Sequence, residues 1–248
     1  MKKIFTLEIC VDSVQSAINA QAGGADRVEF CANMYEGGTS PSYGAIAMAR
    51  KYLDIELSVM IRPRGGDFDY NDIEFEQMKS EILEYKSLGV DGFVFGILDR
   101  DGKIDTVRVK ELVNLAKPAK VTFHRAFDLC KNPFIALNDL ICLGVDRLLT
   151  SGQQARAIDG AKLIKDLIAI ANNEIIIMPG SGINADNIKD LQTKTGAKEF
   201  HMTANKQITS MMRYQKQKVP MGGKLKYSDF AMNETDPEKV REIFFVLG

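Results

Sequence analysis

Short apolar runs alternate with longer amphipathic segments along the chain. One pattern recurs four times: a glycine, a small or β-branched residue, a polar residue and then an apolar run, at residues 22–30, 88–95, 143–150 and 195–202. This order is typical of a helix that ends at a glycine, followed by a tight turn and a buried strand. Four other apolar runs fall between the copies and are predicted to be strands: 5–11, 55–63, 120–125 and 174–180.

The segments between the predicted strands carry helical signals. One apolar stripe has helical spacing: Phe75, Met78, Ile82 and Tyr85. Side chains suited to N-caps precede other predicted helices: Ser13, Asn132, Asn184 and Asp236. Prolines follow two of these caps, and Gly144 is expected to close the helix that begins at Pro133.

The spacing of the repeated pattern predicts the fold. Its glycines, Gly24, Gly89, Gly144 and Gly196, are separated by 65, 55 and 52 residues. A strand–helix unit takes about 30 residues, so each interval holds two units. Eight units in one chain predict a single α/β domain over residues 1–248, a (β/α)8 TIM barrel. An open doubly wound sheet is the alternative, but it leaves the regular spacing unexplained.

A long loop interrupts this rhythm between the eighth strand and the last helix. Residues 203–234 are too many for a simple turn. The loop is basic and rich in methionine: Lys206, Arg213, Lys216, Lys218, Lys224, Lys226, Met211, Met212 and Met221. We expect it to lie over the C-terminal mouth of the barrel, either as a basic lid over an anion or as a structural cover or oligomer contact.

Composition narrows the classes of function. The 32 Lys and Arg residues balance 33 Asp and Glu residues, which argues against nucleic-acid binding. No apolar run reaches the roughly 18 residues of a membrane span, and the N-terminus lacks the core of a signal peptide. Four cysteines without a C-x-x-C motif are too few for a disulfide scaffold. We therefore predict a cytoplasmic protein, and the lack of a Walker loop predicts no nucleotide cofactor.

Chemically versatile side chains fall at the predicted strand ends, where barrels of this type hold their sites. Both histidines do so, and four residues are candidates for acid/base catalysis: Glu8, Glu29, His124 and His201. Eight are candidates for anion binding: Asn33, Arg62, Arg64, Arg125, Ser151, Gly180, Ser181 and Gly182. The last three form a glycine turn before a helix. Structural hydrogen bonds of the histidines and salt bridges of the arginines are the alternatives.

The pattern E-x-C occurs twice, at Glu8/Cys10 and Glu29/Cys31, on strands predicted to be adjacent. Residues two apart in a strand face the same side, and neighbouring strands lie about 4.8 Å apart. If the registers align, the two thiols nearly touch inside the barrel. Two close thiolates suit the soft ion Cu(I). Two buried cysteines that act as small hydrophobic residues are the alternative.

Six ordered motifs together resemble the copper homeostasis protein CutC family, over about residues 5–225: EICVDSVQSAINAQAGGADRVEFCANMYEGGTSPSYG, VMIRPRGGDF, VTFHRAFD, LLTSG, IMPGSGIN and EFH. The resemblance implies a cytoplasmic (β/α)8 barrel, a role in copper handling, Cu(I) binding at Cys10 and Cys31, and a homo-oligomer, a dimer or larger. PGSGI stands where the family often has PGGGI. Met202 follows the histidine of EFH where a small residue is usual, and it offers a further thioether.

Two hypotheses about function follow. The first is a Cu(I)-binding homeostasis protein that uses Cys10 and Cys31. The second is a barrel enzyme that acts by acid/base chemistry on a small anionic metabolite, a phosphate or a carboxylate. In the second, Arg62 and Arg64 bind the anion, and His124 with Glu29 transfers protons.

Overall fold

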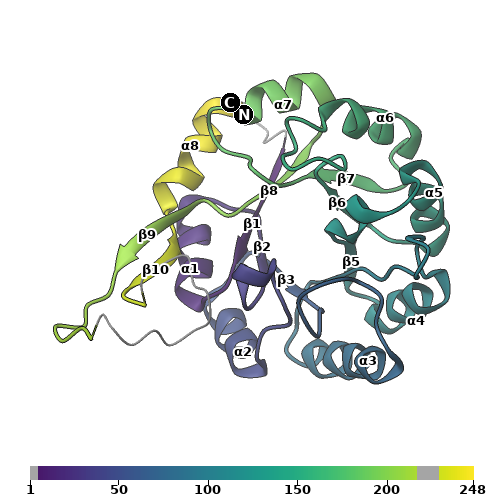
Figure 1. Ribbon diagram of the computed structural model, residues 1–248. Helices are drawn as coiled ribbons and strands as arrows, with labels where there is room; N and C mark the ends of the chain where they lie inside the picture. The colour runs from purple at the N-terminus through teal and green to yellow at the C-terminus, as the bar shows by residue number, and fades with distance from the viewer. Residues whose placement is uncertain (1–4, 217–228) are drawn as a thin grey trace.

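Eight parallel strands form one sheet in the computed structural model, which describes residues 5–216 and 229–248. The strands pair in the order β7-β6-β5-β4-β3-β2-β1-β8. A backbone bridge between Gly180 and His201 joins the two edges, β7 and β8, and eight helices surround the strands (Figure 1). The predicted (β/α)8 barrel is confirmed.

The barrel elements alternate regularly along the chain. The strands are β1 (Thr6–Val11), β2 (Arg27–Phe30), β3 (Glu56–Met60), β4 (Gly92–Phe95), β5 (Lys120–Phe123), β6 (Arg147–Thr150), β7 (Ile176–Pro179) and β8 (Glu199–Met202). The helices are α1 (Val14–Gly23), α2 (Tyr43–Tyr52), α3 (Asp72–Lys86), α4 (Thr106–Ala116), α5 (Pro133–Leu143), α6 (Ala161–Ala171), α7 (Ile188–Thr195) and α8 (Pro237–Leu247). Two short 3-10 helices follow strands, η1 (Met34–Glu36) after β2 and η2 (Arg125–Leu129) after β5.

Most of the predicted helix ends are present. The side chains of Ser13, Asn132 and Asp236 accept hydrogen bonds from backbone N–H groups in the first turns of α1, α5 and α8. Gly144 closes α5 with a φ of 76°. Asn184 was expected to cap α7, but that helix begins at Ile188 after Asn187, because Asn184 instead caps the preceding turn through the N–H of Asp186.

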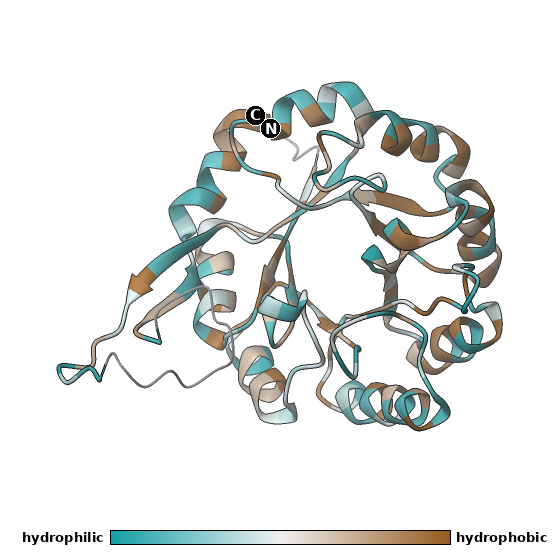
Figure 2. Cartoon of the chain, in the orientation of Figure 1, coloured by the Kyte–Doolittle hydropathy of each residue, from teal (hydrophilic) through white to brown (hydrophobic). Residues whose placement is uncertain are grey.

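The main hydrophobic core lies between the strands and the surrounding helices. Helices pack on it through one face, as the buried residues Phe75, Met78 and Ile82 of α3 illustrate. The helices accordingly show both hydrophobic and hydrophilic bands (Figure 2). A second, small cluster lies apart from this core and consists of Cys10, Cys31, Met60 and Val94. Among the described residues, no helix has the length and apolarity needed to span a membrane.

The described part of the long loop differs from the prediction. Strands β9 (Asn205–Thr209) and β10 (Ala231–Thr235) pair as an antiparallel ribbon that projects away from the barrel beside α1 (Figure 1). The amide of Asn19 on α1 donates hydrogen bonds to Glu234 and to the carbonyl of Thr235, and Lys206 pairs with Asp236. The expectation that this segment lies over the mouth is therefore wrong for residues 205–216. Lys218, Lys224, Lys226 and Met221 lie outside the described residues.

Candidate functional site

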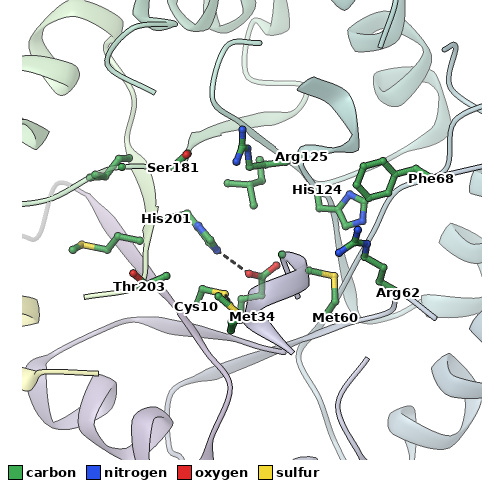
Figure 3. A pocket seen from close by; sticks show the side chains of 16 residues that line it. Cys10, Met34, Met60, Arg62, Phe68, His124, Arg125, Ser181, His201 and Thr203 are labelled. Atoms are coloured by element: carbon green, nitrogen blue, oxygen red, sulfur yellow. Dashed lines mark hydrogen bonds and ion pairs between the residues drawn. The ribbon is translucent and has the colours of Figure 1, made fainter. Parts of the chain in front are cut away.

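A cavity of about 270 Å³ lies at the C-terminal ends of the strands (Figure 3). Eight of the candidate residues line it: Cys10, Glu29, Arg62, His124, Arg125, Ser181, Gly182 and His201. Much of the remaining wall is apolar, from Met34, Met60, Phe68, Leu149, Ile183 and Met202. Residues far apart in the sequence thus meet in one space, because parallel strands place their carboxyl ends together.

The thiol sulfurs of Cys10 and Cys31 lie 3.7 Å apart and are not bonded to each other. Their strands are staggered: Cys10 lies opposite Glu29, and Cys31 follows β2, where its N–H donates to the carbonyl of Val11. The thioether sulfur of Met34, on η1, lies 3.6 Å from the Cys10 sulfur. The sulfur of Cys10 on β1 therefore contacts two others, one from the residue after β2 and one from η1.

A glycine gives the thiol of Cys31 its space. Gly38 has a φ of 89°, and a Cβ atom there would lie 3.2 Å from the sulfur of Cys31. A larger residue at this position would be strained by its backbone conformation and would press on the sulfur. The chain can therefore fold back over Cys31 after η1.

Both thiols are held in their protonated form. The hydrogen bond with Cys31 and burial raise the pKa of Cys10 well above its usual value. The hydrogen bond from Cys10 lowers the pKa of Cys31, but burial and the Glu29 carboxylate outweigh it and raise that pKa to about 11. The pair is therefore a site that must lose protons before it can supply thiolates to a metal.

Glu29 and His201 form a buried ion pair beside the cysteines, with 2.8 Å between the carboxylate oxygen and Nε2 (Figure 3). Burial alone would raise the pKa of Glu29, but the charge of His201 lowers it below its usual value. Burial likewise opposes the charged form of His201, yet Glu29 and a hydrogen bond with Cys10 raise the pKa of this imidazole well above its usual range. The other oxygen of Glu29, Oε1, has no hydrogen-bond partner in the described residues.

His124 follows β5 and is held as a neutral imidazole. Its Nδ1 accepts a hydrogen bond of 3.2 Å from the N–H of Ala126, so the ring hydrogen is on Nε2. Gly96 leaves room for the ring, because a Cβ there would lie 2.5 Å from Nδ1. Burial and the nearby charge of Arg62 lower the pKa of His124 to about 4. Neutral His124 thus differs from protonated His201.

Arg62 is buried beside His124 and is held by the backbone. Its guanidinium donates to the carbonyls of Glu36, Gly38 and Gly66 at 2.7–2.9 Å. The Phe68 ring lies 4.9 Å from both the guanidinium carbon and the centre of the His124 ring. Among the described residues no carboxylate forms a salt bridge with Arg62, so backbone carbonyls alone accept hydrogen bonds from its guanidinium.

Besides Cys31, which is buried behind Cys10, five candidate residues do not line the cavity. Arg64 is on the outside, where Glu74 and Asp67 pair with it, and Asn33 is exposed at the start of η1. Ser151 is buried and accepts a hydrogen bond from Arg125. The N–H of Gly180 donates to the carbonyl of Thr150, and α7 begins only at residue 188, beyond the glycine turn. The fifth residue, Glu8, lies deeper in the barrel.

Glu8 belongs to a buried ionic cluster below the cavity. Its carboxylate pairs with Arg27, which also contacts Glu199 at 2.8 Å. Arg147 pairs with the same Glu199 carboxylate at 2.9 Å. Glu8 is two residues before Cys10 on β1, so its side chain faces the same side one step below that of Cys10. Its second oxygen, Oε1, lies 3.8 Å from Nε2 of His201. This geometry gives Glu8 a structural environment, in which each buried charge has an opposite charge beside it.

Sequence reasoning missed several residues of the site, among them Met34, Met60 and Phe68. Met34 is three residues after Cys31, and this short spacing at a strand end was the signal that could have revealed it. Met60 ends β3 with its side chain among the cysteines, as strand alternation from Arg62 predicts. Phe68 lies in a loop, and no sequence pattern pointed to it.

Comparison with known proteins identifies the family of this chain. The sequence profile of the CutC family matches residues 5–206. The chain belongs to the CutC family. A CutC family protein of Parabacteroides distasonis is 50% identical over 242 residues, covering 97% of this chain and 99% of the relative. A human protein named copper homeostasis protein cutC homolog is 46% identical over 96% of this chain and 88% of its own length.

Solved structures place this CutC family member among barrel proteins. The putative copper homeostasis protein CutC from Streptococcus agalactiae has a TM-score of 0.77 and 37% identity, covering 80% of this chain and 98% of that chain. A thiamine phosphate pyrophosphorylase from Pyrococcus furiosus has a TM-score of 0.58 at 15% identity, covering 99% and 96%. This second likeness reports the fold alone. The shared architecture is thus common to proteins with different chemistry.

Proposed function

We propose that this protein binds Cu(I) as its cargo at Cys10 and Cys31, with Met34 as a third sulfur ligand, and that it serves copper homeostasis. The observation that carries the proposal is the 3.7 Å separation of two unbonded thiol sulfurs. Metal–sulfur bonds of about 2.3 Å reach one ion from both sides of such a gap. Membership of the CutC family supports copper as the metal.

The donor set favours Cu(I) over harder ions. Thiolates and thioethers are soft ligands, and Cu(I) is the soft ion that prefers them. Cys10, Glu29 and Cys31 place their ligand atoms within 4.8 Å of one another, so a carboxylate is also within reach. Glu29 is already paired with His201, however, whereas the Met34 sulfur contacts Cys10 directly. The apolar neighbours Met60 and Val94 shield the sulfur atoms from water.

The cavity provides a path to this site. Cys10 and Met34 line its wall, while Cys31 is buried behind them. A Cu(I) ion that enters the mouth therefore meets Cys10 and Met34 first and Cys31 last. Loading releases the thiol protons into the same cavity, where the Glu29–His201 pair is adjacent.

We place this activity in the cytoplasm. All four cysteines are free, which suits a reducing compartment, where Cu(I) is also the stable form of copper.

We further propose that the chain forms a dimer or larger homo-oligomer. The sulfur ligands all come from one chain, so copper binding does not require assembly. Light scattering of the apo and copper-loaded protein tests whether assembly and copper binding are independent. The expected result is the same oligomer mass in both forms.

X-ray absorption at the copper edge tests the ligand set. The protein loaded anaerobically with one equivalent of Cu(I) is expected to show a first shell made of sulfur alone. Met34→Leu is expected to lower the sulfur coordination number, while Met211→Leu, at an exposed methionine far from the cavity, leaves it unchanged. A first shell dominated by nitrogen or oxygen would contradict the proposal.

A further inference from the structure

His124 presents a buried hydrogen-bond donor with nothing to receive it. Because Nδ1 accepts from the N–H of Ala126, the imidazole carries its hydrogen on Nε2. Nε2 is buried and has no partner within residues 5–216 and 229–248. His124 lines the cavity and is only 4% exposed. Leaving a buried donor without a partner costs free energy, so the Nε2–H of His124 is expected to pair with an acceptor bound in the cavity.

The charges around the cavity leave one positive charge over. Arg125 is neutralised by Asp128 at 2.7 Å, and His201 by Glu29 at 2.8 Å. Arg62 is buried and held only by backbone carbonyls, with no carboxylate partner in the described part of the chain. A buried cation of this kind is stabilised by an anion that binds beside it. One positive charge without a carboxylate partner matches a ligand with one negative charge better than a ligand with two.

Arg62 and His124 are arranged as one recognition surface. Both pack against the Phe68 ring, each at 4.9 Å from its centre. They lie next to each other on a part of the wall separate from Cys10 and Met34 (Figure 3). Three backbone carbonyls and one aromatic ring fix the guanidinium, so little order is lost when a ligand binds.

The rest of the cavity suits an organic body. Leu149, Ile183 and Met202 contribute apolar wall. The volume of about 270 Å³ is close to the lower end of the roughly 300–1,000 Å³ typical of ligand pockets, so the cavity has room for a small organic molecule.

We infer that the cavity binds a small organic monocarboxylate, whose oxygens contact Arg62 and accept from Nε2–H of His124 and whose apolar body packs toward Leu149 and Met202. This site takes a ligand of different chemistry from the copper cargo and uses different side chains. It does not depend on the cysteines. The protein therefore combines a soft metal site with an oxyanion site in one cavity.

Titration calorimetry with three probes that share a phenyl ring tests the inference: benzoate, its neutral amide benzamide, and phenyl phosphate. Benzoate is expected to bind the wild-type protein, and benzamide to bind at least tenfold more weakly because it carries no charge for Arg62. Phenyl phosphate is expected to bind more weakly than benzoate. The Cys10→Ser/Cys31→Ser variant is expected to bind benzoate as the wild type does, which separates this inference from the copper proposal.

His124→Asn tests the donor, because its side-chain oxygen can still accept from the N–H of Ala126 while the Nε2 donor is lost. Benzoate affinity is expected to fall about tenfold or more in this variant. Arg100→Gln, at an exposed arginine outside the cavity, is the control and is expected to leave benzoate affinity unchanged.

Nitrogen NMR of the wild type requires no substitution, and the signals of the His124 ring nitrogens are expected to shift when benzoate is added. Equal binding of benzoate and benzamide, tighter binding of phenyl phosphate, no binding at millimolar benzoate or unmoved His124 signals would overturn the inference.

Discussion

The thiol sulfur of Cys10 lies 3.7 Å from that of Cys31, although the two residues are not opposite each other in the strand register. Cys10 is opposite Glu29, so the thiols meet diagonally across the stagger between β1 and β2. Glu29 of β2 and His201 of β8, on the two strands that flank β1, lie within hydrogen-bond distance of each other. In the proposed copper site, the ligand sulfur atoms and this ion pair are therefore adjacent.

Cu(I) affinity is expected to rise with pH. Cys31 has a pKa of about 11 and that of Cys10 is also raised, so both thiols are protonated at neutral pH and each releases a proton when copper binds. The binding constant should increase up to about a hundredfold per pH unit between pH 6 and 8. Chelator competition at several pH values, corrected for the titration of the chelator, measures this. A pH-independent constant would show that thiolates do not form.

Metal preference is expected to depend on two neighbouring side chains in opposite ways. Met34→Leu removes a soft thioether, so it should weaken Cu(I) binding about tenfold and leave Zn(II) binding nearly unchanged. Glu29→Gln removes the carboxylate of the same cluster, so it should weaken Zn(II) more than Cu(I). Parallel titrations of both variants with both ions provide the comparison. Equal losses for both ions in both variants would refute the assigned donor set.

Acid is expected to destabilise the protein partly through His124. Its folded pKa of about 4 is below the ordinary value of 6.5, so between these pH values the unfolded chain binds a proton that the folded chain does not. Stability is therefore lost as pH falls from about 6.5 to 4, by about 3 kcal/mol for this group. Denaturant unfolding of wild type and His124→Asn at each pH isolates the effect. Parallel curves for the two proteins would rule out a neutral, buried His124.

Glu8 is expected to matter for stability rather than for binding. Removing its carboxylate leaves buried Arg27 with fewer partners, so Glu8→Ala should lower the free energy of unfolding by about 3 kcal/mol. Cu(I) affinity of the folded variant should remain that of the wild type. The exposed Glu76→Gln, which removes a surface pair with Lys79, should cost no more than about 0.5 kcal/mol. A stable Glu8→Ala protein with weak Cu(I) binding would contradict this prediction and show that Glu8 contributes to the copper site.

The fold could be predicted from local signals. The repeated glycine pattern marked helix ends, and Gly24, Gly144 and Gly196 indeed close α1, α5 and α7 with positive φ. Gly89 instead lies three residues beyond the end of α3, whose C-cap is Ser87. Such signals depend on a few neighbouring residues, so helix ends can be predicted from them without knowledge of the tertiary structure. The ribbon formed by residues 205–209 and 231–235 gave no such signal, because its two strands are separated by more than twenty residues.

The site was only partly predictable because it depends on strand stagger and loop paths. The two E-x-C motifs look equivalent in the sequence, yet Glu8 pairs with Arg27 below the cavity while Glu29 pairs with His201 at its wall. Arg62 and Arg64 look like a matched pair, but one is buried and the other faces outward. These differences arise from long-range packing, and no local pattern encodes them.

An anaerobic Cu(I) competition titration against a chromophoric chelator tests the central claim most directly. Wild type and Cys142→Ser, which alters an exposed cysteine on α5, are expected to bind one Cu(I) per chain tightly. Cys10→Ser/Cys31→Ser is expected to lose this binding while it remains folded. Tight binding retained by the double variant, or absent from the wild type, would contradict a copper site at Cys10 and Cys31.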